Sequence, residues 1–145
     1  MRRLRKYFAL TPAARALVLY SLVLLPAVAL SLRACGMART GALLKRLGRA
    51  GAGDSGTLAP REIARLVDAA AAFLRARCLS RSLVLWHFVR NRGAPAEIRL
   101  GVSRLADGKF SAHAWLEYDG RPLNDHADVL QRYAALPSRA KQTAC

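Results

Sequence analysis

Three residues of the 145-residue chain have the types and the chain order of a thiol catalyst, namely Cys78, His113 and Asp125. A cysteine attacks a carbonyl carbon as its thiolate, a histidine takes and returns the proton, and an acid holds the imidazole in the useful tautomer. Of the three histidines, His87 lies nine residues after the cysteine on the same expected helix and cannot reach back to it. The remaining one, His126, is the alternative base.

The cysteine stands at the expected start of a helix. Large apolar residues recur every three or four positions from residue 78 to about residue 91, and Gly93 is expected to stop the helix. A thiol in the first turn lies at the positive end of the helix dipole, which favours the thiolate. Arg77 and Arg81 add positive charge nearby.

Alternating apolar and polar residues predict three strands, over 96–105, 110–118 and the short segment 121–125. The earlier residues are predicted to be helical, including 60–77, where apolar residues recur at helical spacing. Residues 126–136 predict a weak helix. Helices first and an antiparallel sheet last define an α+β fold. A cysteine on a helix and a histidine on a sheet, in this order, form the papain arrangement.

The loop after Tyr118 decides whether His113 faces Asp125. A two-residue loop pairs His113 with His126 and turns Asp125 to the other face of the sheet. A three-residue loop, with Gly120 in the left-handed conformation, pairs Glu117 with Arg121 and places His113 opposite Asp125. We predict the three-residue loop or an equivalent irregularity.

Simpler structural roles exist for each of these residues. A free cysteine is most often a buried apolar residue, and a single histidine on a strand is most often packed or exposed. Asp125 is also well placed to cap a helix that starts near His126. Ser82, one turn after Cys78, and Trp115 are further candidate neighbours of the site.

The N-terminal third has an apolar segment with three interpretations. Residues 16–32 carry no charge, which is near the roughly twenty apolar residues of a membrane span. The preceding basic residues and a small-residue Ala27–Ala29 site also fit a secretory signal. A soluble helix is the third interpretation, with Thr11 as its N-cap, Pro12 at its first position, and Pro26 kinking or ending it.

Composition limits the remaining classes. The net charge of +15 indicates an acidic partner or an anionic surface. Nucleic-acid binding is not favoured, because no finger, helix-turn-helix pattern or interleaved aromatic residues accompany the charge. Three cysteines at unrelated spacings predict neither a disulfide framework nor a metal site, and a reducing, intracellular setting fits them best. We divide the chain into an apolar helical region and loop (1–59) and a core (60–145) within one compact domain.

Residues from Cys78 to about Leu136 resemble a known family. "CLSRSL", "GVSR", "AHAW" and "ND" occur here in the order and at the spacing found in the B2 leader peptidases of lasso-peptide biosynthesis, which belong to the transglutaminase-like superfamily. The resemblance implies a papain-like α+β fold with Cys78 as nucleophile, His113 as general base and Asp125 as orienting acid. No cofactor or metal is expected.

The resemblance also implies a substrate and partners. The substrate would be a ribosomally made precursor peptide, from which the enzyme removes the leader through a thioester. Because residues 1–60 contain no β-rich module, leader recognition would fall to a separate protein, and an ATP-dependent lasso cyclase would act next. We expect a cytoplasmic enzyme, with membrane association through residues 16–32 left open. A membrane-anchored basic binding protein and a non-catalytic scaffold for the cyclase are the alternatives.

The sequence indicates only one donor for an oxyanion. No glutamine precedes Cys78, since Gln131 and Gln142 are the only ones in the chain. The backbone N–H of Cys78 is one expected donor, and the sequence identifies no second.

Overall fold

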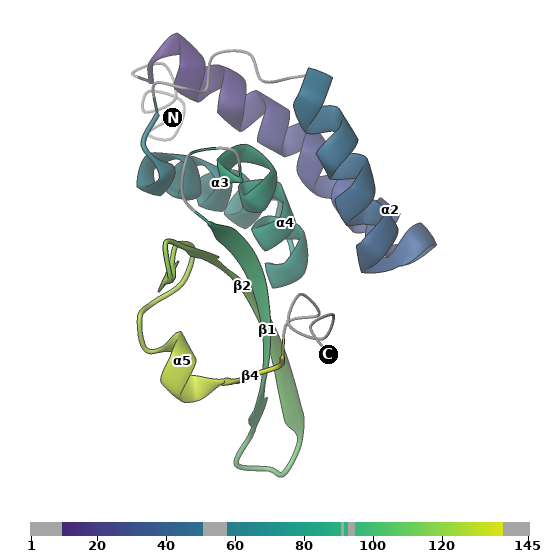
Figure 1. The fold of residues 1–145 in the computed structure, drawn as a ribbon, viewed down its shortest axis with the longest axis vertical. Helices are drawn as coiled ribbons and strands as arrows, with labels where there is room; N and C mark the ends of the chain where they lie inside the picture. Colours follow the sequence, from purple (N-terminus) through teal and green to yellow (C-terminus); the bar gives the residue numbers. More distant parts are fainter. Residues whose placement is uncertain (1–9, 51–57, 91, 93–94, 138–145) are drawn as a thin grey trace.

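The structure is a computed structural model that describes residues 10–50, 58–90, 92 and 95–137. The basic segment before residue 10, the loop 51–57, Gly93 and the tail after residue 137 lie outside the described residues. Three helices precede a small antiparallel sheet, as predicted for an α+β fold (Figure 1). The elements are α2 (Pro12–Ala50), α3 (Pro60–Leu74), α4 (Cys78–Val89), β1 (Ala96–Arg104), β2 (Phe110–Tyr118), β3 (Arg121–Pro122), α5 (Val129–Arg132) and β4 (Ala134–Ala135).

Helix α2 begins as its sequence predicts but breaks at a different residue. The backbone N–H of Ala14 donates to Thr11 Oγ1 at 3.3 Å, and Pro12 is the first helical residue. The soluble-helix interpretation has Pro26 kinking or ending the helix; the helix continues through Pro26 and does not end there. The non-helical residue is Gly36, with φ 75° and ψ 177°. Glycine adopts a positive φ without the steric cost of a Cβ, which makes it the point where the chain can turn.

The turn at Gly36 divides α2 into two arms that lie side by side. Ser31 Oγ and Thr40 Oγ1 are hydrogen-bonded at 2.9 Å, although nine residues of straight helix would separate them by about 13 Å. Thr40 Oγ1 also donates to the carbonyl of Gly36 at 2.8 Å. Figure 1 shows the first arm in purple and the second in blue, on the far side of the molecule from the tip of the sheet.

One core joins the helices to one face of the sheet. It is made by the inner sides of both α2 arms, the apolar faces of α3 and α4, and one residue of β2. The larger buried members are Leu17, Leu24, Leu25, Val28, Leu44, Leu58, Ile63, Leu66, Val67, Leu83, Val84, Leu85, Val89 and Leu116. The N-terminal region is therefore packed into the same core as α3 and α4.

Helix α3 is shorter than its sequence pattern suggests. The prediction extended it to residue 77, whereas it ends at Leu74, and Arg75 takes the left-handed conformation with φ 52°. Its N–H and that of Ala76 then bond to carbonyls of the last turn, which is how many helices terminate. Phe73, which falls at the helical spacing of the apolar residues in 60–77, is exposed.

The sheet has the strand order β3-β2-β1-β4. The second hairpin has a two-residue loop, because Tyr118 pairs with Arg121 and Glu117 with Pro122. The predicted three-residue loop is therefore wrong. Asp119 and Gly120 both have positive φ, of 53° and 70°, which is the type I′ turn that matches the twist of a hairpin.

The C-terminal segment is helical over one turn only. The prediction treated residues 126–136 as one weak helix, but the backbone becomes extended at Tyr133. Ala134–Ala135 then form β4, which pairs with β1 at Gly101 and Val102. This strand brings Tyr133 back over the sheet.

Helix α4 is tied to the second arm of α2 at its C-terminal end. His87 Nδ1 lies 3.1 Å from the carbonyl oxygen of Leu44 and donates to it, and Arg90 donates to the carbonyl of Lys45 at 3.2 Å. Burial lowers the pKa of His87 below its ordinary value; the Leu44 carbonyl acts in the opposite direction, and the charge of Arg90 adds to the lowering. The neutral imidazole is thus the form that fits this contact.

Stability should fall on mild acidification because of His87. Below about pH 6.5 the unfolded chain takes up a proton at this residue that the folded chain, with its lowered pKa, does not. The free energy of unfolding should therefore decrease as the pH falls from 7 towards 5. His87→Asn keeps a donor for Leu44 and should remove this component, whereas His126→Asn, at an exposed position, should leave it in place. Urea denaturation at each pH measures it; an identical slope in wild type and His87→Asn would contradict this assignment.

Candidate active site

His113 and Asp125 are hydrogen-bonded through His113 Nε2 and Asp125 Oδ2. A carboxylate only accepts, so Nε2 carries the hydrogen and Nδ1 remains as the nitrogen that can exchange a proton with a thiol. Both side chains are largely buried, and they come from β2 and from the segment just after β3. The predicted approach of the two residues is therefore present.

The chain reaches this geometry by leaving the sheet early. Leu123 still donates its N–H to the carbonyl of Leu116 at 2.8 Å, in the manner of a ladder. At the next residue a side chain replaces the backbone acceptor: Asn124 Oδ1 accepts from the N–H of Leu116 at 2.7 Å. Asp125 is thus released from the register that would turn it to the other face. This is the equivalent irregularity that the two-residue loop requires.

The second histidine of this segment does not take the place of His113. A two-residue loop favours His126 as the alternative base, and the structure has that loop. His126 is nevertheless exposed. It donates its backbone N–H to Asp125 Oδ1 at 2.8 Å. Helix α5 begins only at Val129, so Asp125 is not its N-cap.

The surroundings of Asp125 favour its charged form. Burial acts to raise its pKa, but hydrogen bonds from His113 and from the N–H of His126 lower it by more. The charges of His113 and Arg81 act in the same direction, so the pKa lies below its ordinary value. At neutral pH the group is a carboxylate that can stabilise an imidazolium on His113.

A buried hydrogen-bond network fixes α4 against β2. Ser82 Oγ donates to the carbonyl of Ala114 at 3.1 Å and accepts from Asn124 Nδ2 at 3.1 Å. Asn124 is 5% exposed and Ser82 is fully buried. The same asparagine therefore satisfies β2, shapes the chain before Asp125 and holds the helix that carries Cys78.

Cys78 is the first residue of α4, one turn before Ser82, and its side chain is partly exposed. Arg77 is the N-cap in an extended conformation, and it makes no side-chain capping bond to the first turn. The N–H groups of this turn have no partners within the helix, so they can donate to an oxyanion. Within the described residues no hydrogen bond joins Cys78 Sγ to His113. The structure brings the two elements together, and catalytic hydrogen bonds commonly tighten only when substrate binds.

Two aromatic rings pack against the imidazole of His113. Trp115 is stacked with it at a centroid distance of 6.2 Å, and Tyr133 lies 5.0 Å away. Gly101 pairs with His113 across the β1–β2 ladder. A Cβ at Gly101 would lie 2.9 Å from both the Trp115 ring and the Cβ of Tyr133, so only glycine leaves room for them.

An ion pair between α3 and α4 lies near Asp125. Arg81 Nε lies 3.5 Å from Asp68 Oδ1, and Arg81 Nη2 donates to the carbonyl of Asn124 at 2.9 Å. The pKa of Asp68 lies above its ordinary value, mainly because of burial. The charge of Arg81 lowers this pKa, and the charge of Asp125 raises it. Arg81 is thus placed between two acids, and its charge is shared with Asp68.

The sequence assigned no role in the site to Asn124, Tyr133, Gly101 or Asp68, although Gly101 and Asn124 stand in the "GVSR" and "ND" motifs. Asn124 carried a signal, since a buried amide beside an acid at the end of a short strand is a means of ending a ladder. The other three are brought in by tertiary contacts that no local pattern encodes. In the described residues no group of three or more His, Cys, Asp or Glu side chains is placed to hold a metal ion.

Cys78 is the first residue of a helix, and His113 and Asp125 are hydrogen-bonded to each other on and just after the antiparallel sheet. These residue types, on these elements, are the ones that papain-like thiol enzymes use. A family model described as the transglutaminase-like superfamily matches residues 21–138, so the chain belongs to that superfamily. The match includes most of α2 as well as the sheet. No curated protein and no solved structure matches the chain.

Asn124→Leu should lower the free energy of unfolding by about 1–3 kcal/mol, because it leaves the buried N–H of Leu116 without a partner. Urea denaturation monitored by circular dichroism measures the change. Ser103→Ala, on β1 and outside this network, is the control and should change stability by less than about 0.5 kcal/mol. Equal effects of the two substitutions would show that Asn124 does not hold the site together.

Gly101→Ala should destabilise the fold by about 1–3 kcal/mol, because the new methyl group overlaps Trp115 and Tyr133. Gly41→Ala is the matched control, since a Cβ there meets nothing within 4 Å and the residue lies in a helix. That variant should be neutral or more stable. The two melting temperatures give the comparison, and a neutral Gly101→Ala would contradict the packing described for His113.

Proposed function

We propose that the chain is a cysteine peptidase that removes the leader from a ribosomally made lasso-peptide precursor. The observation that carries the proposal is the His113–Asp125 hydrogen bond on a strand that Ser82 and Asn124 tie to the helix of Cys78. Membership in the transglutaminase-like superfamily supports thiol chemistry. The resemblance of residues 78–136 to the B2 leader peptidases supports the substrate.

The reaction follows from the three side chains. His113 takes the thiol proton of Cys78, and the thiolate attacks the carbonyl carbon of the scissile amide. The first-turn N–H groups of α4 stabilise the resulting oxyanion. The C–N bond then breaks, and His113 returns the proton to the amine that becomes the new N-terminus of the core peptide. Water, deprotonated by His113, attacks the thioester carbonyl and the C–S bond breaks. His113 returns its proton to the Cys78 thiolate, and the leader leaves as a free acid that ionises to a carboxylate.

The partners are proposals of the same kind. A separate leader-recognition protein would present the precursor, and an ATP-dependent lasso cyclase would use the freed N-terminus. The excess of positive charge in the chain suits an acidic face on one of these proteins or on the leader. Transfer to an amine in place of water would give an acyltransferase, and the same residues would carry it.

Cleavage of a precursor peptide in the presence of its recognition protein should depend on each member of the triad. Cys78→Ala and His113→Ala should each lower kcat/KM by about 10⁴-fold or more, and Asp125→Ala should retain at least about tenfold more rate than either. Mass spectrometry of the products measures this and distinguishes a free N-terminus from an isopeptide.

The controls separate loss of chemistry from loss of folding or of binding. His126→Ala, at the exposed neighbouring position, should keep nearly full rate, and Cys78→Ala should still bind the recognition protein. Unchanged cleavage by Cys78→Ala would exclude the thioester mechanism. If Asp125→Ala kept full activity and His126→Ala lost it, the base would be His126 and the assignment of His113 would be wrong.

A further inference from the structure

The charge of the chain is concentrated in its N-terminal third. The first 53 residues contain ten Lys or Arg and no Asp or Glu. Four of these cations, Arg33, Arg39, Lys45 and Arg46, are exposed on α2. Helix α2 (Pro12–Ala50) carries only positive charges, so it is attracted to an anionic surface and repels a second copy of itself.

The first arm of α2 also presents an apolar stripe to solvent. Leu19, Val23, Pro26 and Leu30 fall within about 60° of one another around the helix, and all are exposed. Val23 and Leu30 are each 69% exposed, which is unusual for large aliphatic residues that share one face. No charged residue interrupts the stripe between residues 16 and 32.

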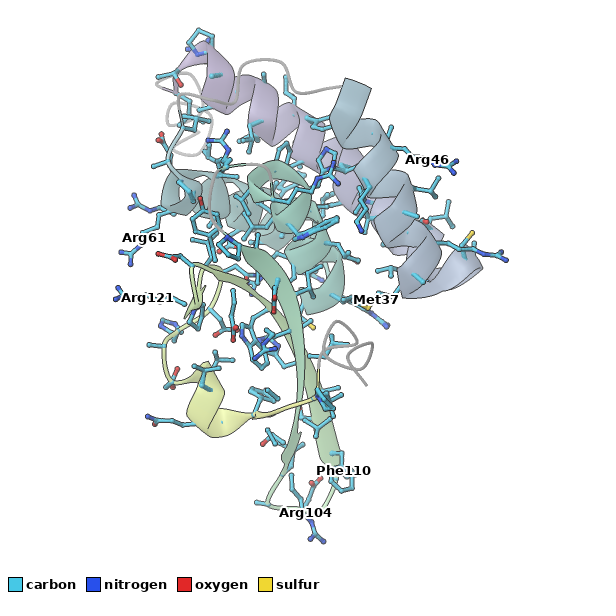
Figure 2. All side chains as sticks on the ribbon, viewed as in Figure 1. Met37, Arg46, Arg61, Arg104, Phe110 and Arg121 are labelled. Carbon is cyan, nitrogen blue, oxygen red and sulfur yellow. The ribbon has the colours of Figure 1, made fainter. Side chains whose placement is uncertain are left out.

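The second arm continues this character with cations beside the apolar residues. Leu43 and Leu47 are exposed on one face, and Arg39 and Arg46 flank them on the same side. Figure 2 shows Arg46 directed away from the rest of the molecule. Long basic side chains beside exposed aliphatic residues are typical of helices that lie at a membrane surface.

By length and composition, residues 12–48 form the one helix of the described chain that qualifies for crossing a membrane. Its packing does not suit a span. The face opposite the stripe carries Leu17, Leu24, Leu25 and Val28, which are buried against α3 and α4. Gly36 then turns the chain back on itself. Lipid can therefore reach only the outer side of the helix while the fold stays intact.

We propose that α2 docks on an anionic lipid bilayer, with the stripe in the headgroup and upper acyl region and the cations on lipid phosphates. The charge complementarity and the aliphatic character of the stripe favour lipid over a protein partner, whose interfaces are richer in aromatic residues. The docked chain would lie on the membrane surface through α2, with the sheet on the other side of the molecule (Figure 1). This inference is independent of the proposed peptidase activity.

Co-sedimentation of the full chain with vesicles tests the proposal. Vesicles of phosphatidylcholine and phosphatidylglycerol in equal amounts should bind the chain, and vesicles of phosphatidylcholine alone should bind it at least about tenfold more weakly. Added salt should weaken the binding, because the attraction is between exposed charges. No difference between the two vesicle types, or no binding to either, would overturn the proposal.

Matched variants assign the binding to α2. Leu19→Gln/Val23→Gln/Leu30→Gln should weaken anionic-vesicle binding by about tenfold or more, and Leu105→Gln/Phe110→Gln at the tip of the sheet should not. Arg39→Gln/Arg46→Gln should weaken it, and Arg104→Gln/Arg121→Gln on the sheet should have less effect (Figure 2). Circular dichroism confirms that each variant is folded. Equal effects of the α2 and sheet variants would show that net charge, and not this surface, drives binding.

Two further readouts keep other interpretations separate. Size-exclusion chromatography without lipid should give a monomer. A wild-type dimer that becomes a monomer in Leu19→Gln/Val23→Gln/Leu30→Gln would assign the stripe to a second copy and overturn the proposal. Precursor cleavage in solution should be unchanged by the same variant, because none of its three residues lies at the site. Vesicle binding by a wild-type chain that cleaves no precursor would show that docking stands even where the peptidase proposal fails.

Discussion

The site depends on one buried amide. Asn124 accepts from the N–H of Leu116 where a backbone carbonyl would otherwise stand, and donates to Ser82 on the helix of Cys78. A buried N–H left without a partner costs about 1–3 kcal/mol, so the asparagine side chain is held in this position by the sheet itself. Three features of the fold follow from these two hydrogen bonds. Strand β3 ends after two residues, Asp125 lies on the side of His113, and α4 is fixed beside β2.

The local elements were predictable from the sequence, and their register was not. Residues 110–118 and the start of the helix at Cys78 follow from periodicity, turn residues and the α+β order. The two-residue turn at Asp119–Gly120 was the alternative that should have separated His113 from Asp125. The pair forms nevertheless, because the chain departs from the ladder at Asn124. Period-two reasoning cannot foresee a side chain that replaces a backbone acceptor.

The other surprises also come from long-range packing. A continuous apolar pattern predicted a helix over residues 16–32 but did not indicate that it would fold back at Gly36, ten residues after the proline expected to interrupt it. The final segment formed β4 because pairing with β1 places Tyr133 against His113, and this outweighs a weak helix propensity. Gly101 belongs to the site only because two rings need the space that its side chain would fill.

Alkylation of the cysteines by iodoacetamide, followed by peptide mass mapping, tests most directly whether the fold places Cys78 under the influence of the His113–Asp125 pair. Cys35 is exposed and serves as an internal reference in the same chain. The account predicts that Cys78 reacts faster than Cys35 at neutral pH, despite being less exposed, and that His113→Ala removes the advantage. Slower reaction at Cys78 than at Cys35, unaffected by His113→Ala, would contradict it and return Cys78 to a packing role.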